Sequence, residues 1–244
     1  MSPTPRWICL TALLLGVSLG VAGAASTARQ VRPVSGYSAI RLVGAIDLVV
    51  AQGTTESVSI EGDADQIREV TTTVDKGTLV ISHATGGSLW SWFRVPDTAP
   101  RAVVSVKSIA ALELEGSGDA RVIGTLVSQE PFLARVTGSG DIRIDAIAAR
   151  ALEVRISGTG GVHMAGAATD AIVRIAGSGD FAGGDLKTVT CKVTISGSGD
   201  AVVWARDRLE VSVAGSGDVG YYGTPVISQS LAGSGTLKAL GAKN

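Results

Sequence analysis

A four-residue phrase recurs seven times in the second half of the chain, and it constrains the fold more than any other feature. Its full form is Gly-Ser-Gly-Asp, and its copies begin at Gly116, Gly138, Gly158, Gly177, Gly197, Gly215 and Gly233. The third copy reads Gly-Thr-Gly-Gly and the last reads Gly-Ser-Gly-Thr. The first glycines are separated by 22, 20, 19, 20, 18 and 18 residues. A period near twenty is typical of repeat proteins, in which one small unit stacks on its neighbours.

The residues around each phrase alternate between apolar and polar. Positions two, four and six before the phrase are apolar in every case but one, Gln229 in the last repeat. The residue three before it is polar or charged in all seven copies, as in Arg174 and Thr194. A shorter alternation follows the phrase, where Ile142 and Ile144 flank Arg143. Alternation of this kind indicates strands with one buried face, so each repeat is expected to hold two short strands joined by two corners.

A unit of about twenty residues cannot bury its own apolar face, but stacked units share one interior. The sequence therefore predicts an all-β fold, a parallel β-solenoid with rungs of about twenty residues. The second glycine of a phrase, such as Gly179 or Gly199, is expected at φ > 0, which glycine reaches without steric cost. The inward positions should stack from rung to rung, and they include Val154, Val173, Val193 and Val211.

The start of the chain is interpreted as a targeting segment. Residues 1–25 contain Arg6, an apolar run and the small residues Ala22-Gly23-Ala24, which together indicate a cleaved signal peptide. A retained membrane anchor is the alternative. Beyond this segment Cys191 is the only cysteine, and its inward position predicts a small core residue. The formal net charge of −1 gives no reason to expect a nucleic-acid partner.

The remainder divides into a flexible leader at residues 26–36 and one continuous domain at residues 37–240. Residues 37–108 are expected to form irregular first rungs that cap the solenoid, and residues 109–240 form the repeats. Within the cap, Asp63 could begin a short helix, and Asp75-Lys76-Gly77 indicates a hairpin. A cluster of aromatic residues interrupts the pattern and is either an exposed binding tip or a loop that covers the core: Trp90, Trp92 and Phe93.

No catalytic constellation is evident, and no cofactor is expected. The two histidines, His83 and His163, lack the spacing of metal ligands. The repeated phrase lacks the lysine and the strand-to-helix context of a phosphate-binding loop. We therefore expect a non-enzymatic protein.

The aspartates of the phrases could form a metal site. Asp119 and Asp141 should stack about one rung, or about 4.8 Å, apart, and so should Asp180, Asp200 and Asp218. Unit charges at that distance repel by about 1 kcal/mol in water, and bound Ca²⁺ could relieve this repulsion. The alternative is that each carboxylate accepts backbone N–H bonds at its own corner.

Outward basic residues line up in two columns. Arg135, Arg155 and Arg174 share one register, and Arg121, Arg143 and His163 share the other. Such columns could bind acidic glycans, although three carboxylates are near enough to balance them: Glu113, Asp145 and Glu153.

The tandem Gly-Ser-Gly-Asp corners, each preceded by a strand, resemble the head GIN domain of auto-transporter adhesins. Residues 40–53, Ile-Arg-Leu-Val-Gly-Ala-Ile-Asp-Leu-Val-Val-Ala-Gln-Gly, and residues 215–225 are also similar to that domain. The resemblance covers residues 37–240. It implies an exported bacterial β-solenoid, resident in the periplasm, at the outer membrane or outside the cell, and it brings no catalytic residues.

Two classes of function remain from the sequence. The first is an adhesion or scaffold module of the envelope that presents flat strand faces to a polymer or a protein partner. The second is a polysaccharide-processing enzyme that acts on acidic glycans. A calcium-dependent binding module is a further alternative if the aspartates hold metal.

Overall fold

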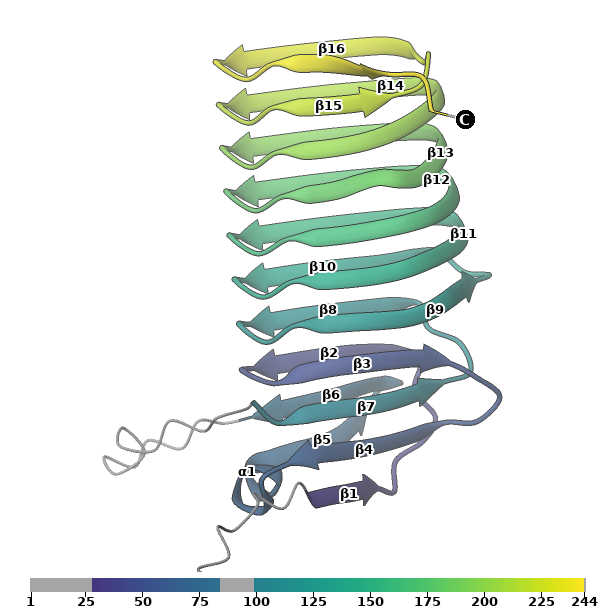
Figure 1. Cartoon of the computed structure of the whole chain (residues 1–244), viewed down its shortest axis with the longest axis vertical. Helices are drawn as coiled ribbons and strands as arrows, with labels where there is room; N and C mark the ends of the chain where they lie inside the picture. Colours follow the sequence, from purple (N-terminus) through teal and green to yellow (C-terminus); the bar gives the residue numbers. More distant parts are fainter. Residues whose placement is uncertain (1–27, 84–98, 244) are drawn as a thin grey trace, which may run out of the picture.

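The computed structural model describes residues 28–83 and 99–243, which form a tall β-solenoid (Figure 1). Each rung is one complete turn of the chain. The repeat region supplies most of the stack, and its strands are β8 (Ala111–Gly116), β9 (Ala120–Ser128), β10 (Phe132–Gly138), β11 (Ile142–Gly158), β12 (Val162–Gly177), β13 (Phe181–Gly197), β14 (Ala201–Gly215), β15 (Val219–Tyr222), β16 (Val226–Gly233) and β17 (Leu237–Gly241). The predicted fold class is therefore confirmed.

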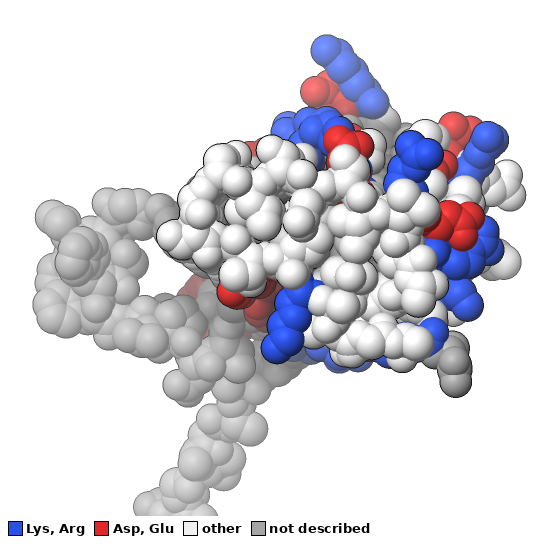
Figure 2. Space-filling view, turned by 90° about the horizontal axis from the view of Figure 1, so that it is seen from above, with Lys and Arg blue, Asp and Glu red and all other residues white. Residues whose placement is uncertain are grey.

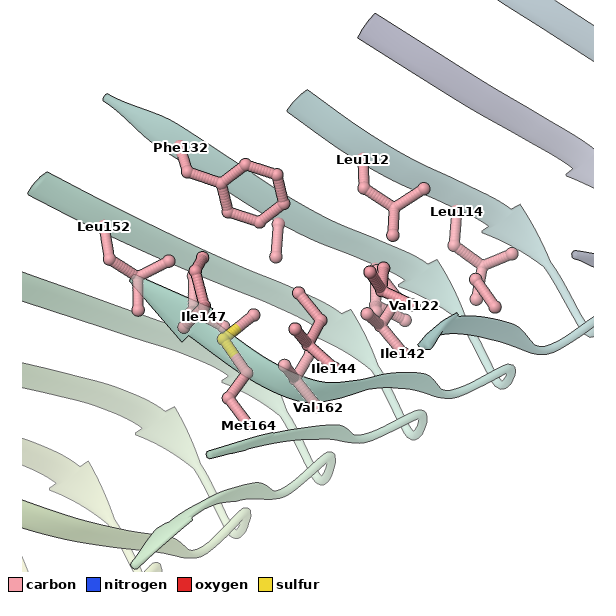
Figure 3. Packing of buried hydrophobic residues seen from close by; sticks show 14 of the residues in the cluster. Leu112, Leu114, Val122, Phe132, Ile142, Ile144, Ile147, Leu152, Val162 and Met164 are labelled. Atoms are coloured by element: carbon pink, nitrogen blue, oxygen red, sulfur yellow. The ribbon is translucent and has the colours of Figure 1, made fainter. Parts of the chain in front are cut away.

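The register of the repeats is the one that the alternation predicted. Val154 pairs with Val173, which pairs with Val193, and that residue pairs with Val211. All four side chains are buried. Figure 3 shows how residues before and after the corners fill one interior, with Leu112 and Leu114 of β8 lying opposite Ile142 and Ile144 of β11. Each rung thus contributes a strand to each of two parallel sheets that enclose the core.

Only one of the two expected corners interrupts the strands. The Gly-Ser-Gly-Asp corner is tight, but β11 to β14 continue through the other bend as strands of 15 to 17 residues. Register shifts mark this bend, for example between Ile144 and Ile147. The expectation of two short strands per repeat was wrong here, because a bulge bends a strand without ending its hydrogen bonding.

The N-terminal part caps the stack, but its rungs do not follow chain order. Strand β2 (Ala39–Gly44) lies between β6 (Thr78–His83) and β8, and β3 (Asp47–Gln52) lies between β7 (Arg101–Val106) and β9. The first rung of the chain is thus interior to the stack. The segment after it folds back to form the end (Figure 1), where β4 (Ser57–Gly62) runs antiparallel to both β1 (Ala28–Arg32) and β7.

Two local predictions for this cap are confirmed. Asp63 caps the helix α1 (Ala64–Glu69), and its side chain accepts a hydrogen bond from the Asp65 N–H. The hairpin joins β5 (Val70–Asp75) to β6, with Lys76 at φ 48° and Gly77 at φ 78°. Within the described residues no helix is long and apolar enough to cross a membrane.

Candidate functional site

The corners stack directly on one another, and this contact decides which residues they accept. The first glycine of each phrase is the one at positive φ, as in Gly177 (124°) and Gly197 (135°). The prediction for Gly179 and Gly199 was therefore wrong, since neither has a left-handed backbone. The second glycine is required for space instead. A Cβ at Gly179 would lie 2.1 Å from the carbonyl oxygen of Gly160 on the preceding rung.

The aspartates connect successive rungs rather than closing their own corners. The Oδ1 atom of Asp180 accepts the backbone N–H of Asp200 at 2.8 Å, and Oδ1 of Asp200 accepts that of Asp218 at 2.8 Å. Asp218 accepts both the N–H and the hydroxyl of Thr236, each at 2.8 Å. These two bonds hold the pKa of Asp218 below its usual value, the hydroxyl contributing most. The alternative prediction, that each carboxylate accepts backbone N–H bonds at its own corner, was therefore wrong, because the N–H groups belong to the next rung.

A second series of these bonds begins in the first rung of the chain. Asp47 accepts the N–H of Asp119 at 3.2 Å, Asp119 accepts that of Asp141 at 2.9 Å, and Asp141 accepts that of Gly161 at 2.6 Å. Gly161 carries no carboxylate, so the series ends there and the other begins at Asp180. Within the described part of the chain, no group of three or more His, Cys, Asp or Glu residues could hold a metal ion.

Sequence reasoning missed the participation of Asp47. The segment Gly44-Ala45-Ile46-Asp47 is a corner without the repeated letters, and Gly44 pairs with Gly116 at φ 101°. The spacing of its glycine and aspartate is the same as in the other corners, so a search for Gly-x-x-Asp would have found it.

A shallow groove of about 860 Å³ lies beside these aspartates on one sheet. It crosses the rungs of β7, β3, β9, β11, β12 and β13, which are neighbours in that order. At about 4.8 Å per rung the groove extends for roughly 24 Å. Its floor carries the predicted column of Arg121, Arg143 and His163, whose register the structure confirms. Arg101 and Asp47 add charges from the N-terminal rungs.

The basic groups of the groove are largely balanced by carboxylates. Arg121 donates to both oxygens of Asp145, at 3.1 and 3.2 Å, and the Arg143 guanidinium is 3.9 Å from the same carboxylate. Asp185, beside His163, has a pKa lowered by its hydrogen bond from Lys243, with a smaller contribution from His163. The groove therefore offers alternating hydrogen-bond donors and acceptors without a strong field of one sign.

The other predicted column lies on the opposite sheet. Arg135, Arg155 and Arg174 are in register, beside a hollow of about 450 Å³. Arg155 and Arg174 both contact Oε1 of Glu153, at 2.8 and 3.3 Å. The Arg155 hydrogen bond is the main reason why the pKa of Glu153 lies below its usual value. Among the described contacts Arg135 has no ion pair. On the later rungs the same column continues with the uncharged residues Thr194, Ser212 and Ser230.

Two further sequence predictions concern aromatic and thiol groups. Trp90, Trp92 and Phe93 fall outside the described residues. Cys191 is buried in the core, where burial raises the pKa of its thiol to about 12. The structure adds an aromatic cluster that the sequence did not single out. The Lys243 Nζ lies 4.7 Å from the Tyr222 ring and 5.8 Å from the Trp204 ring, and it donates to the Gly184 carbonyl at 2.9 Å.

These features define a class of protein, a β-solenoid whose corners are bonded from rung to rung and whose sheets carry polar columns. Residues 36–225 match the family described as "Putative auto-transporter adhesin, head GIN domain". The chain belongs to this family, whose name implies an exported protein. A search of curated proteins returns no match.

Solved structures of bacterial proteins have the same fold. A protein of Bacteroides fragilis titled a putative adhesin is 21% identical, with 89% of this chain and 98% of that chain covered and a TM-score of 0.82. A putative adhesin from Parabacteroides merdae is 19% identical, with the same coverages and a TM-score of 0.67. A protein of Parabacteroides distasonis titled a putative lipid binding protein is 24% identical, again with these coverages and a TM-score of 0.67.

Proposed function

We propose that this chain is a non-enzymatic adhesion module of the bacterial cell envelope, and that it binds an extended polysaccharide along the groove. One observation carries the proposal: each of six successive rungs contributes at least one polar or charged side chain to the groove, and three adjacent rungs carry the column of Arg121, Arg143 and His163. A polymer has repeating units of its own, so a repeating surface can contact several of them at once. Each contact is weak, but contacts along one chain add through their high effective concentration.

The balance of charge in the groove favours sugar hydroxyls as the groups that are bound. A hydroxyl both donates and accepts hydrogen bonds, and it can therefore contact guanidinium N–H groups and aspartate oxygens in turn. A strongly anionic glycan would gain from the arginines but would be repelled by Asp47, Asp119, Asp141 and Asp180 along the same groove. This is why a neutral or weakly charged polysaccharide is preferred over an acidic one.

The non-enzymatic part of the proposal is supported by the engagement of these carboxylates. A glycosidase requires a pair of carboxyl groups that converge on one glycosidic bond. Here Asp119 and Asp141 each accept a backbone N–H from the next rung, which makes them structural acceptors. An exported protein of this kind would act in the periplasm, at the outer membrane or outside the cell.

The test is a glycan array screened with three forms of the protein. The wild type is compared with the groove variant Arg121→Gln/Arg143→Gln and with a control that removes two arginines from the opposite sheet, Arg155→Gln/Arg174→Gln. We expect binding of a polysaccharide that falls at least tenfold in the groove variant and is retained in the control. Loss of polysaccharide binding in the control alone would refute the groove as the binding site. A folded wild type that binds no polysaccharide would refute the ligand class.

A further inference from the structure

Among the residues that the structure describes, none covers the C-terminal end of the stack. Strand β16 pairs with β14 along one edge, β17 pairs with β15, and among the described residues neither has a strand on its other side. Every residue of β16 is exposed, including Val226, Ile227 (38%) and Leu231 (40%). Figure 2 looks onto this end and shows a surface that is mostly uncharged, with acidic and basic residues around its rim. The end therefore exposes both unpaired backbone groups and apolar side chains.

The other end of the solenoid is different, because antiparallel strands and α1 cover it. Natural edge strands are also commonly protected by charged residues, by proline or by short length. Strand β16 has none of these protections. Its eight residues read Val-Ile-Ser-Gln-Ser-Leu-Ala-Gly and include no charge and no proline.

The backbone groups on the open edge belong to the inward residues. On an earlier rung, the N–H of the outward residue Leu133 donates to the Ala110 carbonyl of the rung before it, at 2.8 Å. In a strand the direction of the main-chain groups alternates from one residue to the next. Ile227, Gln229 and Leu231 therefore direct their N–H and C=O groups away from β14, toward the open edge.

We propose that this edge binds a second copy of the chain, with β16 antiparallel to its own copy about a two-fold axis at Gln229. The pattern Ile-Ser-Gln-Ser-Leu has the same chemistry in either direction. In this register Ile227 pairs with Leu231 of the partner subunit, and both side chains point into the shared core. Gln229 faces Gln229 of the partner subunit, so that the two amides can satisfy each other.

This register also satisfies the backbone. The residues that pair are the ones whose N–H and C=O groups point to the open edge, so each pair exchanges both main-chain hydrogen bonds. No charged side chain of β16 meets its own copy. The two-fold interface is self-complementary, as a closed dimer requires.

The dimer would place both grooves on one continuous sheet. The two-fold axis crosses the end of the stack from one sheet to the other, so each sheet of one copy continues into the same sheet of its partner. Two grooves on one face raise the avidity for a polymer without any new contact. The dimer itself does not depend on the proposed ligand.

The first experiment measures mass by light scattering over a range of protein concentrations. We expect the wild type to have twice the mass of one chain. Gln229→Lys should be monomeric, since it sets two ammonium groups against each other, and an unchanged circular dichroism spectrum would show that it folds. Ser230→Lys, whose side chain points outward, should remain dimeric. A wild type that is monomeric throughout, or a Gln229→Lys variant that stays dimeric, would overturn the proposal.

The second experiment tests the register by disulfide formation. The Cα atoms of a hydrogen-bonded antiparallel pair lie about 5.5 Å apart, a distance that a disulfide spans. Gln229→Cys should therefore cross-link into a dimer on oxidation, and Ser230→Cys should not. Equal cross-linking of the two variants would overturn the register. A monomer whose β16 amides resist hydrogen exchange would show that another segment covers the edge, and it would overturn the proposed occupant.

Discussion

Replacing Gly179 with alanine tests the stacking of the corners most sharply. The added Cβ would lie 2.1 Å from the Gly160 carbonyl oxygen and 2.7 Å from Cγ2 of Ile156. Ordinary contact begins at about 3.4 Å, so adjacent corners must separate by more than an ångström. That movement would also weaken the bond from the Ser178 N–H to the Gly158 carbonyl, which is 2.9 Å long.

The expected cost follows from these two effects. Overpacking costs about 1 to 3 kcal/mol, and each weakened hydrogen bond adds about 1 kcal/mol. We therefore expect Gly179→Ala to lower the free energy of unfolding by about 2 to 4 kcal/mol. Gly124→Ala is the matched control, because Gly124 has φ 76° but no atom within 4 Å of an added Cβ. Its cost should be only the backbone strain, about 1 to 2 kcal/mol.

Urea denaturation followed by circular dichroism gives both values. A Gly179→Ala variant that is no less stable than Gly124→Ala would refute the argument that the second glycine is required for space. A much larger cost at Gly124 would show that backbone conformation, rather than the approach of the rungs, decides where glycine is needed.

Three further predictions follow from the stacked rungs and their bonds. Val173→Asp should abolish soluble folding because it buries a charge in the core, whereas the neighbouring Arg174→Asp should cost less than about 1 kcal/mol; equal destabilisation in chemical denaturation would contradict the register. EDTA or millimolar Ca²⁺ should leave the Tm unchanged, and Asp200→Asn should fold because its amide oxygen can still accept the Asp218 N–H. A calcium-dependent rise in Tm that Asp200→Asn removes would instead support a metal site. The pKa of Glu153 is lowered from 4.5 in the folded state, so its contribution to stability is present above about pH 4.5 and is lost as the pH falls through the folded pKa. Glu153→Gln should therefore flatten the acid side of a plot of Tm against pH. An unchanged slope would count against the ion pair between Glu153 and the arginines.

The repeats could be predicted from sequence because their period fixes the register. An alternation of two residues inside a repeat of about twenty leaves one way to stack Val154 on Val173, and it also aligns the outward arginines. The position of β2 and β3 could not be predicted in this way. Their neighbours in the stack are strands far along the chain, and local alternation carries no information about which distant edge a strand will pair with.

The roles of the individual residues in each corner also could not be predicted from the sequence. The letters Gly-Ser-Gly-Asp show that a tight bend is needed, but they do not show which glycine takes the positive φ and which one makes room for the rung below. The same holds for Asp200, whose carboxylate reaches the backbone of the next rung because the stacked corners place that N–H within 2.8 Å. The groove could not be predicted either, because Asp47 and Arg101 line it from N-terminal rungs whose place in the stack the sequence does not show.

The most direct test of the proposed function is the dependence of affinity on the length of the ligand. Oligosaccharides of increasing length, taken from the best polysaccharide on the array, are titrated into the protein by calorimetry. A groove with a polar or charged side chain on each of six rungs predicts that affinity rises with added sugars until the oligomer spans roughly 24 Å. It also predicts that Arg121→Gln/Arg143→Gln reduces this rise. A monosaccharide that binds as tightly as the longest oligomer would contradict the account, because it would show a single pocket in place of a repeating surface.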